Sequence, residues 1–143
     1  MPSKNALSTN NQQERLKLAY WIVGFTDGEG TFSVGKIKNL TTKSGYQIFP
    51  EFVITQGAKS LKALEKIKTF FKCGKVYINK RYDNHQEDIF RYCVRSRKDL
   101  TEKIIPFFKE FRLKTAKLKD FQKFCKIIEL MNQGKHLEKN FQL

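Results

Sequence analysis

Three glycines and two carboxylates fall between Gly24 and Gly30, in the stretch GFTDGEG. An apolar run with helical spacing leads directly into them. The two acids, Asp27 and Glu29, offer the hard oxygen atoms that Mg²⁺ and similar divalent cations prefer. Beside a phosphodiester, such a cation can activate water and stabilise the attacking and leaving oxygens. The same residues also fit a simple glycine-capped helix end with two exposed acids.

The glycine spacing indicates how this helix end is used. Gly24 and Gly28 are four residues apart and share one face of the predicted helix, which leaves room for a second helix backbone. The chain has only one such helix, so the expected partner is its copy in a second subunit. We expect Tyr20 and Asp27 to lie in the same homodimer interface. The two Glu29 carboxylates then approach the dimer axis, where like charges need cations between them.

We therefore assign a divalent metal, Mg²⁺ by preference, to Glu29 and Gly28. Gly28 and Gly30 are expected to permit an unusual backbone turn that ends the helix and projects Glu29. The chain has two histidines and three widely spaced cysteines, which argues against zinc, His-based nucleophilic catalysis and a disulfide framework. The odd cysteine count suits a reducing intracellular compartment.

The charge of the chain indicates a polyanionic partner. Lys and Arg number 28 against 14 acids in 143 residues, a formal charge of +14. Phosphates that these side chains neutralise release their counterions, which favours binding. The alternative is an ordinary protein from a lysine-rich genome. No apolar run approaches the ~20 residues of a membrane span.

Hydrophobic periodicity predicts the element order αββαββα in one domain at 14–132, between a flexible tail at 1–13 and a polar tail at 133–143. The expected elements are a helix from residue 14, strands 31–38 and 46–56, a helix 59–71 that Gly74 stops, strands 75–81 and 89–95, a helix from residue 96 that Pro106 ends or kinks, and a helix 115–131. This order predicts an α+β fold with one four-stranded antiparallel sheet, helices on one face and an open, saddle-like face on the other.

Strand alternation indicates which side chains line that open face. Ile48, Phe52, Ile54 and Ile78 are expected to face the core. The open-face side chains are basic, amide-bearing or partly aromatic: Ser33, Gln47, Phe49, Glu51, Val53, Thr55, Lys75, Tyr77, Asn79, Arg81, Arg91 and Arg95. Such a surface can read base edges in the major groove of double-stranded DNA. A merely solvated face should carry more acids.

The stretch Ile22 to Gly30, IVGFTDGEG, resembles the LAGLIDADG signature of homing endonucleases. Its glycines and Asp27 fall on the small and acidic positions, and Glu29 falls on the second acid, the family's metal ligand. Val23 stands where alanine is commoner, and Thr26 replaces an apolar residue. The predicted αββαββα order is also the family's core. One copy of the motif is visible, which resembles the single-motif branch that works as homodimers on near-palindromic DNA.

The resemblance implies two further catalytic positions. Gln56, in VITQ, is similar to a glutamine that orders active-site water, and Lys114, in RLKTAK, is similar to a lysine that lines the same pocket. Another basic position of the family falls on Lys59 or Ser60, and the alignment leaves both open.

The leading interpretation is an Mg²⁺-dependent, site-specific double-strand DNA endonuclease. A non-cleaving intron-RNA maturase or DNA-binding regulator is the alternative, and a basic structural or ribosome-associated protein is a third. A protein encoded in an organelle intron would belong in a mitochondrion or chloroplast.

Overall fold

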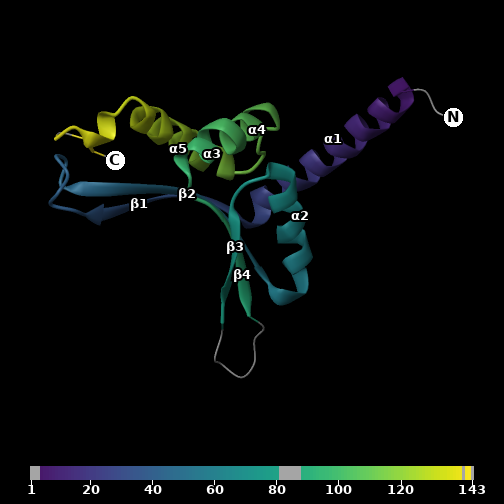
Figure 1. Cartoon of the computed structure of the whole chain (residues 1–143), viewed down its shortest axis with the longest axis horizontal. Helices are drawn as coiled ribbons and strands as arrows, with labels where there is room; N and C mark the ends of the chain where they lie inside the picture. The colour runs from purple at the N-terminus through teal and green to yellow at the C-terminus, as the bar shows by residue number, and fades with distance from the viewer. Residues whose placement is uncertain (1–3, 81–87, 140, 143) are drawn as a thin grey trace.

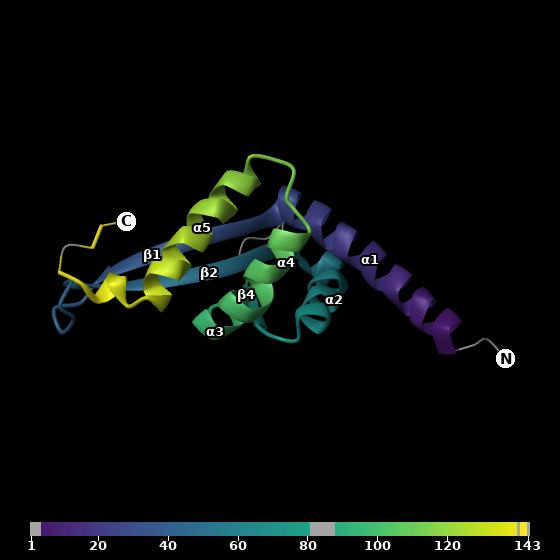
Figure 2. The same cartoon turned by 90° about the horizontal axis from the view of Figure 1, so that it is seen from above.

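The computed structural model describes residues 4–80, 88–139 and 141–142, with side chains from residue 10 onward (Figure 1). Its strands form one antiparallel sheet in the order β1-β2-β4-β3. These strands are β1 (Gly30–Lys38), β2 (Tyr46–Gly57), β3 (Lys75–Asn79) and β4 (Ile89–Val94). Figure 2 shows α4 and α5 lying across β1 and β2. The predicted α+β class with a four-stranded antiparallel sheet is confirmed.

The helices bury their apolar stripes against the sheet. In α2 (Leu61–Phe71), which follows the 3₁₀ turn η1 (Ala58–Ser60), Leu64, Ile67 and Phe71 are buried at three- and four-residue steps. Helix α5 (Lys117–Asn132) buries Phe121, Phe124, Cys125, Ile128 and Met131 in the same way. A second 3₁₀ turn, η3 (Lys135–Leu137), follows it.

Phenylalanines fill the space between sheet and helices. Phe32 of β1 stacks on Phe52 of β2, with ring centroids 5.0 Å apart. The rings of Phe108, Phe121 and Phe124 surround Phe32 at centroid distances of 5.5, 5.2 and 5.4 Å. Because each aromatic side chain buries a large apolar area, this cluster dominates the core energetically.

The first helix is longer than expected. Helix α1 (Lys4–Glu29) begins at Lys4 and not at Glu14, so most of the segment expected to be a flexible tail is helical. Its N-terminal half projects away from the other elements in both views (Figures 1 and 2). The C-terminal half packs on the core through Ala19, Ile22 and Val23. None of the helices in the described part of the chain has the length and apolar content needed to cross a bilayer.

Pro106 does not end the helical run that starts after Ser96. The Ser96 hydroxyl accepts the backbone N–H of Asp99 at 3.3 Å and so caps the start of the run. The run continues through α3 (Arg97–Asp99), the π-helical segment η2 (Leu100–Ile104) and α4 (Ile105–Glu110). Proline lacks an N–H and crowds the carbonyl of the preceding turn, and the wider π turn just before it accommodates both effects.

Helix α2 ends at a lysine before the glycine that was expected to stop it. Lys72 takes the left-handed conformation at φ 58°, and Gly74 follows at φ 85° in the turn into β3. A Cβ atom at Gly74 would lie 2.6 Å from the Tyr92 ring. Both the backbone conformation and the space therefore require glycine at this position.

The strand register confirms the predicted alternation across β2 and β4, but not at the far end of β3. Phe52 pairs with Val94 on the core face, and the next pair, Val53 with Cys93, lies on the opposite face. Ile78, expected in the core, has 46% of its surface exposed. It lies at the far end of the β3–β4 hairpin, outside the buried cluster. Its side chain is therefore exposed although strand alternation places it on the core face of the sheet.

Candidate active site

Glu29 is the last residue of α1, and its side chain is exposed where the helix meets β1. The unusual turn expected here is absent: Gly28 is helical, Gly30 opens β1, and neither has a positive φ. A Cβ at Gly30 would lie 2.6 Å from the Thr26 Cγ2 atom and 2.9 Å from the Thr26 carbonyl oxygen. Gly30 is therefore required for close packing, which lets the strand begin directly under the helix end.

The end of α1 is an electronegative position. Its last turn contains Asp27 and Glu29 and no basic residue. The terminal carbonyls of a helix carry partial negative charge, which favours a cation at this end. The exposed Glu29 carboxylate and nearby backbone carbonyls are hard oxygen donors and fit a divalent cation of the Mg²⁺ or Ca²⁺ type. Among the described residues, no group of three or more His, Cys, Asp or Glu side chains could hold a metal by itself.

Asp27, expected in the subunit interface, forms its hydrogen bonds within the chain. Its carboxylate accepts the backbone N–H of Lys114 at 2.9 Å, the backbone N–H of Thr115 at 3.2 Å and the Thr115 hydroxyl at 2.8 Å. Partial burial acts to raise the pKa of Asp27, but these hydrogen bonds to its charged form outweigh it and leave the pKa lowered. Asp27 therefore holds the loop between α4 and α5 against the end of α1.

Lys117 lies next to Glu29 and was not among the site residues predicted from the sequence. Its ammonium group donates a hydrogen bond to the carbonyl oxygen of Gly30, next to Glu29. Lys117 is the first residue of α5, where side chains point back toward the helix N-terminus and so toward the loop. The side chain of Lys114 is exposed, and its backbone is the part that Asp27 holds. The signal that could have pointed to Lys117 is the helix start within RLKTAK, since α5 begins at this residue.

Gln56 lies at the same end of the sheet as Glu29. Gly30 pairs with Ile54, and Gln56 follows two residues later on β2, where it is half-buried and pairs with Phe90. Of the two candidates that the alignment left open, Lys59 is exposed and Ser60 is half-buried, both in η1.

The open face of the sheet brings together most of the side chains expected on it. Two rows cross the strands there, Thr31–Val53–Cys93–Lys75 and Thr55–Arg91–Tyr77. The exposed members of the predicted set are Gln47, Phe49, Lys75, Tyr77, Asn79 and Arg95, the half-buried members are Ser33, Glu51, Thr55 and Arg91, and Val53 is buried. Arg81 lies outside the described residues. The Nε atom of Arg91 is buried and has no hydrogen-bond partner in the part of the chain that the structure describes.

The face of α1 that carries Gly24 and Gly28 is open. A Cβ atom at either glycine would meet no atom within 4 Å. Leu16, Tyr20 and Trp21 on this side of the helix are 44%, 62% and 39% exposed. An apolar helix surface with two glycines at its centre therefore stands uncovered beside Glu29.

Known proteins share this fold. The chain is 36% identical over 101 residues to a probable intron-encoded DNA endonuclease 1 of Mycosarcoma maydis, over 71% of this chain but 33% of that protein. The crystal structure of the homing endonuclease I-TnaI matches with a TM-score of 0.73 and 41% identity, over 83% of this chain and 76% of that one. I-SmaMI bound to cleaved DNA matches with a TM-score of 0.74 and 31% identity, over 83% of this chain and 38% of that chain.

The chain thus spans about a third of the curated relative's length. The model of the LAGLIDADG endonuclease family matches residues 22–128, from the acidic helix end through the sheet to α5. That match covers the elements that place Glu29, Gln56 and Lys117, and the chain belongs to the LAGLIDADG endonuclease family.

Proposed function

We propose that the chain is a site-specific double-strand DNA endonuclease that works as a homodimer with a divalent metal, Mg²⁺ by preference, on a near-palindromic target. The observation that carries the proposal is the position of Glu29, exposed at the end of a helix whose glycine face is uncovered in the described part of the chain. Two chains joined along that face bring two carboxylates together, whereas the described residues of one chain contain no metal-binding group of three or more His, Cys, Asp or Glu.

Each residue near Glu29 has a task in phosphodiester hydrolysis. The metal supplies charge stabilisation and activation of water when it is bound. Glu29 holds it, with the Gly28 carbonyl beside it, and the half-buried Gln56 amide orients the attacking water. The ammonium groups of Lys117 and Lys114 stabilise the negative charge that develops on the phosphate. Asp27 holds the loop that carries Lys114 and leads into Lys117.

The open face binds the target. Its exposed positions include Lys75 and Arg95 beside amide and aromatic side chains. Strand β2 is long enough to follow the major groove, since 12 residues at about 3.3 Å each extend about 40 Å. I-SmaMI has been captured on an uncleaved DNA target in the presence of calcium ions. Several relatives are named as intron-encoded endonucleases, which supports a role in intron homing from an organelle intron.

The test separates cleavage from binding at Glu29. Glu29→Gln is nearly isosteric but loses the charge that holds the metal, so we expect cleavage with Mg²⁺ to stop while binding with Ca²⁺ survives. Glu65→Gln, an exposed glutamate on α2, is the matched control and should cut like wild type. The duplex target is first selected from a randomised library with wild-type protein. Cleavage by Glu29→Gln at the wild-type rate would refute the metal assignment, and binding without cleavage by the wild type would favour the maturase or regulator.

A further inference from the structure

Glu51 and Arg95 form an ion pair on the open face of the sheet. The Nε–H group of Arg95 donates to the Oε2 atom of Glu51 at 2.8 Å. The two residues adjoin the last pair of the β2–β4 ladder, Phe52 with Val94, since Glu51 precedes Phe52 and Arg95 follows Val94. Tyr77 of β3 adds a second contact, since the Arg95 guanidinium carbon lies 5.4 Å from the centre of its ring.

This pair contributes little to stability. The side chains of Arg95 and Glu51 are 52% and 27% exposed, and exposed ion pairs contribute about 0–1 kcal/mol. A carboxylate on a surface that meets DNA is also repelled by phosphates unless a cation neutralises it. An acid in the middle of this face therefore needs another physical reason, and the geometry of the guanidinium supplies one.

The ion pair orients Arg95 without occupying its recognition edge. A guanidinium has five N–H groups in a rigid plane, and Glu51 uses only the one on Nε. The four N–H groups on the terminal nitrogens stay available, and they match the O6 and N7 acceptors of guanine in the major groove. Because Glu51 and Tyr77 restrain the side chain before DNA arrives, less conformational entropy is lost when a base is bound.

Arg91, four residues earlier and within β4, is different. Its Nε atom is buried without a hydrogen-bond partner among the described residues, and its side chain forms no ion pair with a described acid. The chain itself therefore orients Arg95, just after the end of β4, whereas the Arg91 Nε–H group is left for an acceptor on DNA.

We propose that Arg95 determines specificity for one guanine in each half-site, and that Glu51 is a positioning residue that acts through Arg95. This inference rests on the proposed DNA-binding function and specifies part of its recognition. It predicts that Glu51 influences base preference only while Arg95 is present.

The experiment is a base-by-base binding profile on the duplex selected with wild-type protein, in Ca²⁺. Arg95→Ala should lose preference for guanine at one position per half-site by about 5- to 160-fold, the equivalent of 1–3 kcal/mol for a bidentate contact. Arg95→Lys keeps the positive charge but lacks the planar guanidinium that donates two parallel hydrogen bonds. It should therefore lose the same preference for guanine, while its overall affinity for DNA stays higher than that of Arg95→Ala. Glu51→Gln should weaken the preference at the same base pair.

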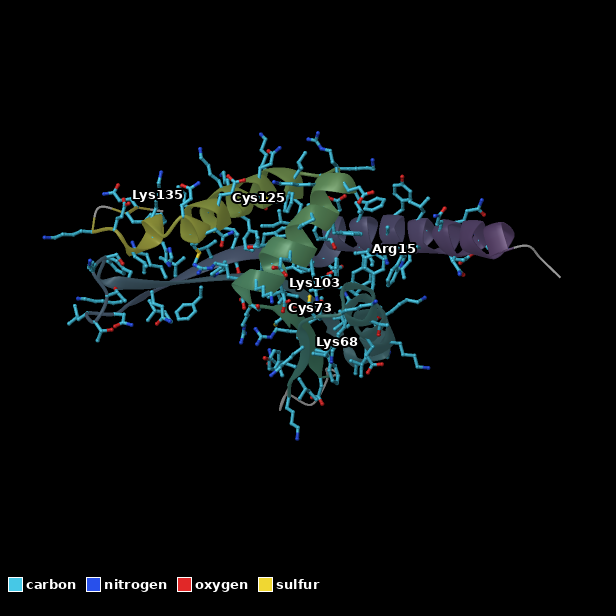
Figure 3. The ribbon with its side chains drawn as sticks, turned by 45° about the horizontal axis from the view of Figure 1, so that its top comes forward. Arg15, Lys68, Cys73, Lys103, Cys125 and Lys135 are labelled. Atoms are coloured by element: carbon cyan, nitrogen blue, oxygen red, sulfur yellow. The ribbon has the colours of Figure 1, made fainter. Side chains whose placement is uncertain are left out.

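The combined variant distinguishes positioning from direct reading. Glu51→Gln in the Arg95→Ala background should add no further change to the profile. Glu65→Gln and Lys68→Ala, exposed changes on α2, are the controls and should leave the profile unchanged; Figure 3 shows Lys68 on this helix. Thermal unfolding of every variant verifies that the fold is intact.

Three results would overturn the inference. Arg95→Ala could keep the wild-type preference, Glu51→Gln could relax a different base pair, or Glu51→Gln could act fully without Arg95. A wild-type protein that selects no sequence at all would instead refute the proposed function, and the inference with it.

Discussion

The Asp27 carboxylate accepts the backbone N–H of Lys114 at 2.9 Å and thereby joins the acidic end of α1 to the loop before α5. The residues that it connects are distant in sequence. The loop contains Lys114 and leads into Lys117 at the start of α5, the two lysines proposed for the active site. The first acid of the motif is therefore a structural clamp, and the second acid, Glu29, remains exposed.

Asp27→Asn should weaken this clamp. Asparagine offers one oxygen acceptor and no charge, so we expect a loss of about 1 kcal/mol of unfolding free energy at neutral pH, after allowance for partial exposure. The folded-state pKa of Asp27 is lowered, so its stabilisation is complete above the ordinary aspartate value of about 4 and is lost as pH falls through the folded pKa. Denaturant unfolding should show the wild-type advantage shrinking in acid; an advantage that is constant with pH would contradict the clamp.

Gly30→Ala should destabilise the junction of α1 and β1. The added methyl group would lie 2.6 and 2.9 Å from Thr26 atoms, and overpacking of this kind costs about 1–3 kcal/mol. Gly35→Ala on the same strand is the control, because its nearest neighbours would be 3.6 Å away. Thermal unfolding of both variants measures the difference. Equal midpoints for the two variants would show that the close packing at Gly30 is unimportant.

Gly24→Leu should separate the subunits without unfolding the chain. The leucine side chain starts in open space within one chain but would push apart two helices that cross at this glycine. Sedimentation should then give a monomer with a wild-type circular dichroism spectrum and no cleavage, while the control Lys62→Leu on α2 stays dimeric. A wild-type monomer that cuts DNA by itself would refute the homodimer.

Lys117 and Lys114 should differ in their importance for cleavage. The Lys117 ammonium group already lies on the Gly30 carbonyl beside Glu29, whereas the Lys114 side chain is exposed to solvent. We expect Lys117→Ala to lower the single-turnover cleavage rate about 100-fold or more, as the loss of one charge-stabilising donor does, and Lys114→Ala to lower it less. The reverse order would return the main role to Lys114.

The salt dependence of binding tests the charge argument. If the dimer contacts about 6–10 phosphates, its affinity should fall about 10³–10⁵-fold between 50 and 200 mM salt. Filter binding or fluorescence anisotropy on the selected duplex measures the slope. A nearly flat response would contradict nucleic-acid binding as the reason for the net charge of +14.

Local patterns in the sequence determined the α+β class, the strand register and the position of the acidic motif. Alternation on β2 follows from the pleat of a strand, and the burial of Leu64, Ile67 and Phe71 follows from helical periodicity, so both can be predicted without tertiary structure. Ser96 likewise carries its capping function in its own side chain.

Only the tertiary structure decided contacts between distant segments. Three contacts depend on how α5 and β1 pack against the end of α1. Asp27 binds Lys114 and Thr115, and Lys117 reaches the Gly30 carbonyl. Gly30 leaves the space that Thr26 occupies. No periodicity encodes such distances, because a side chain's partner across the fold depends on the packing of every element between them. The same physical reason explains why Ile78 is exposed despite its alternation: burial requires a covering element as well as a strand face.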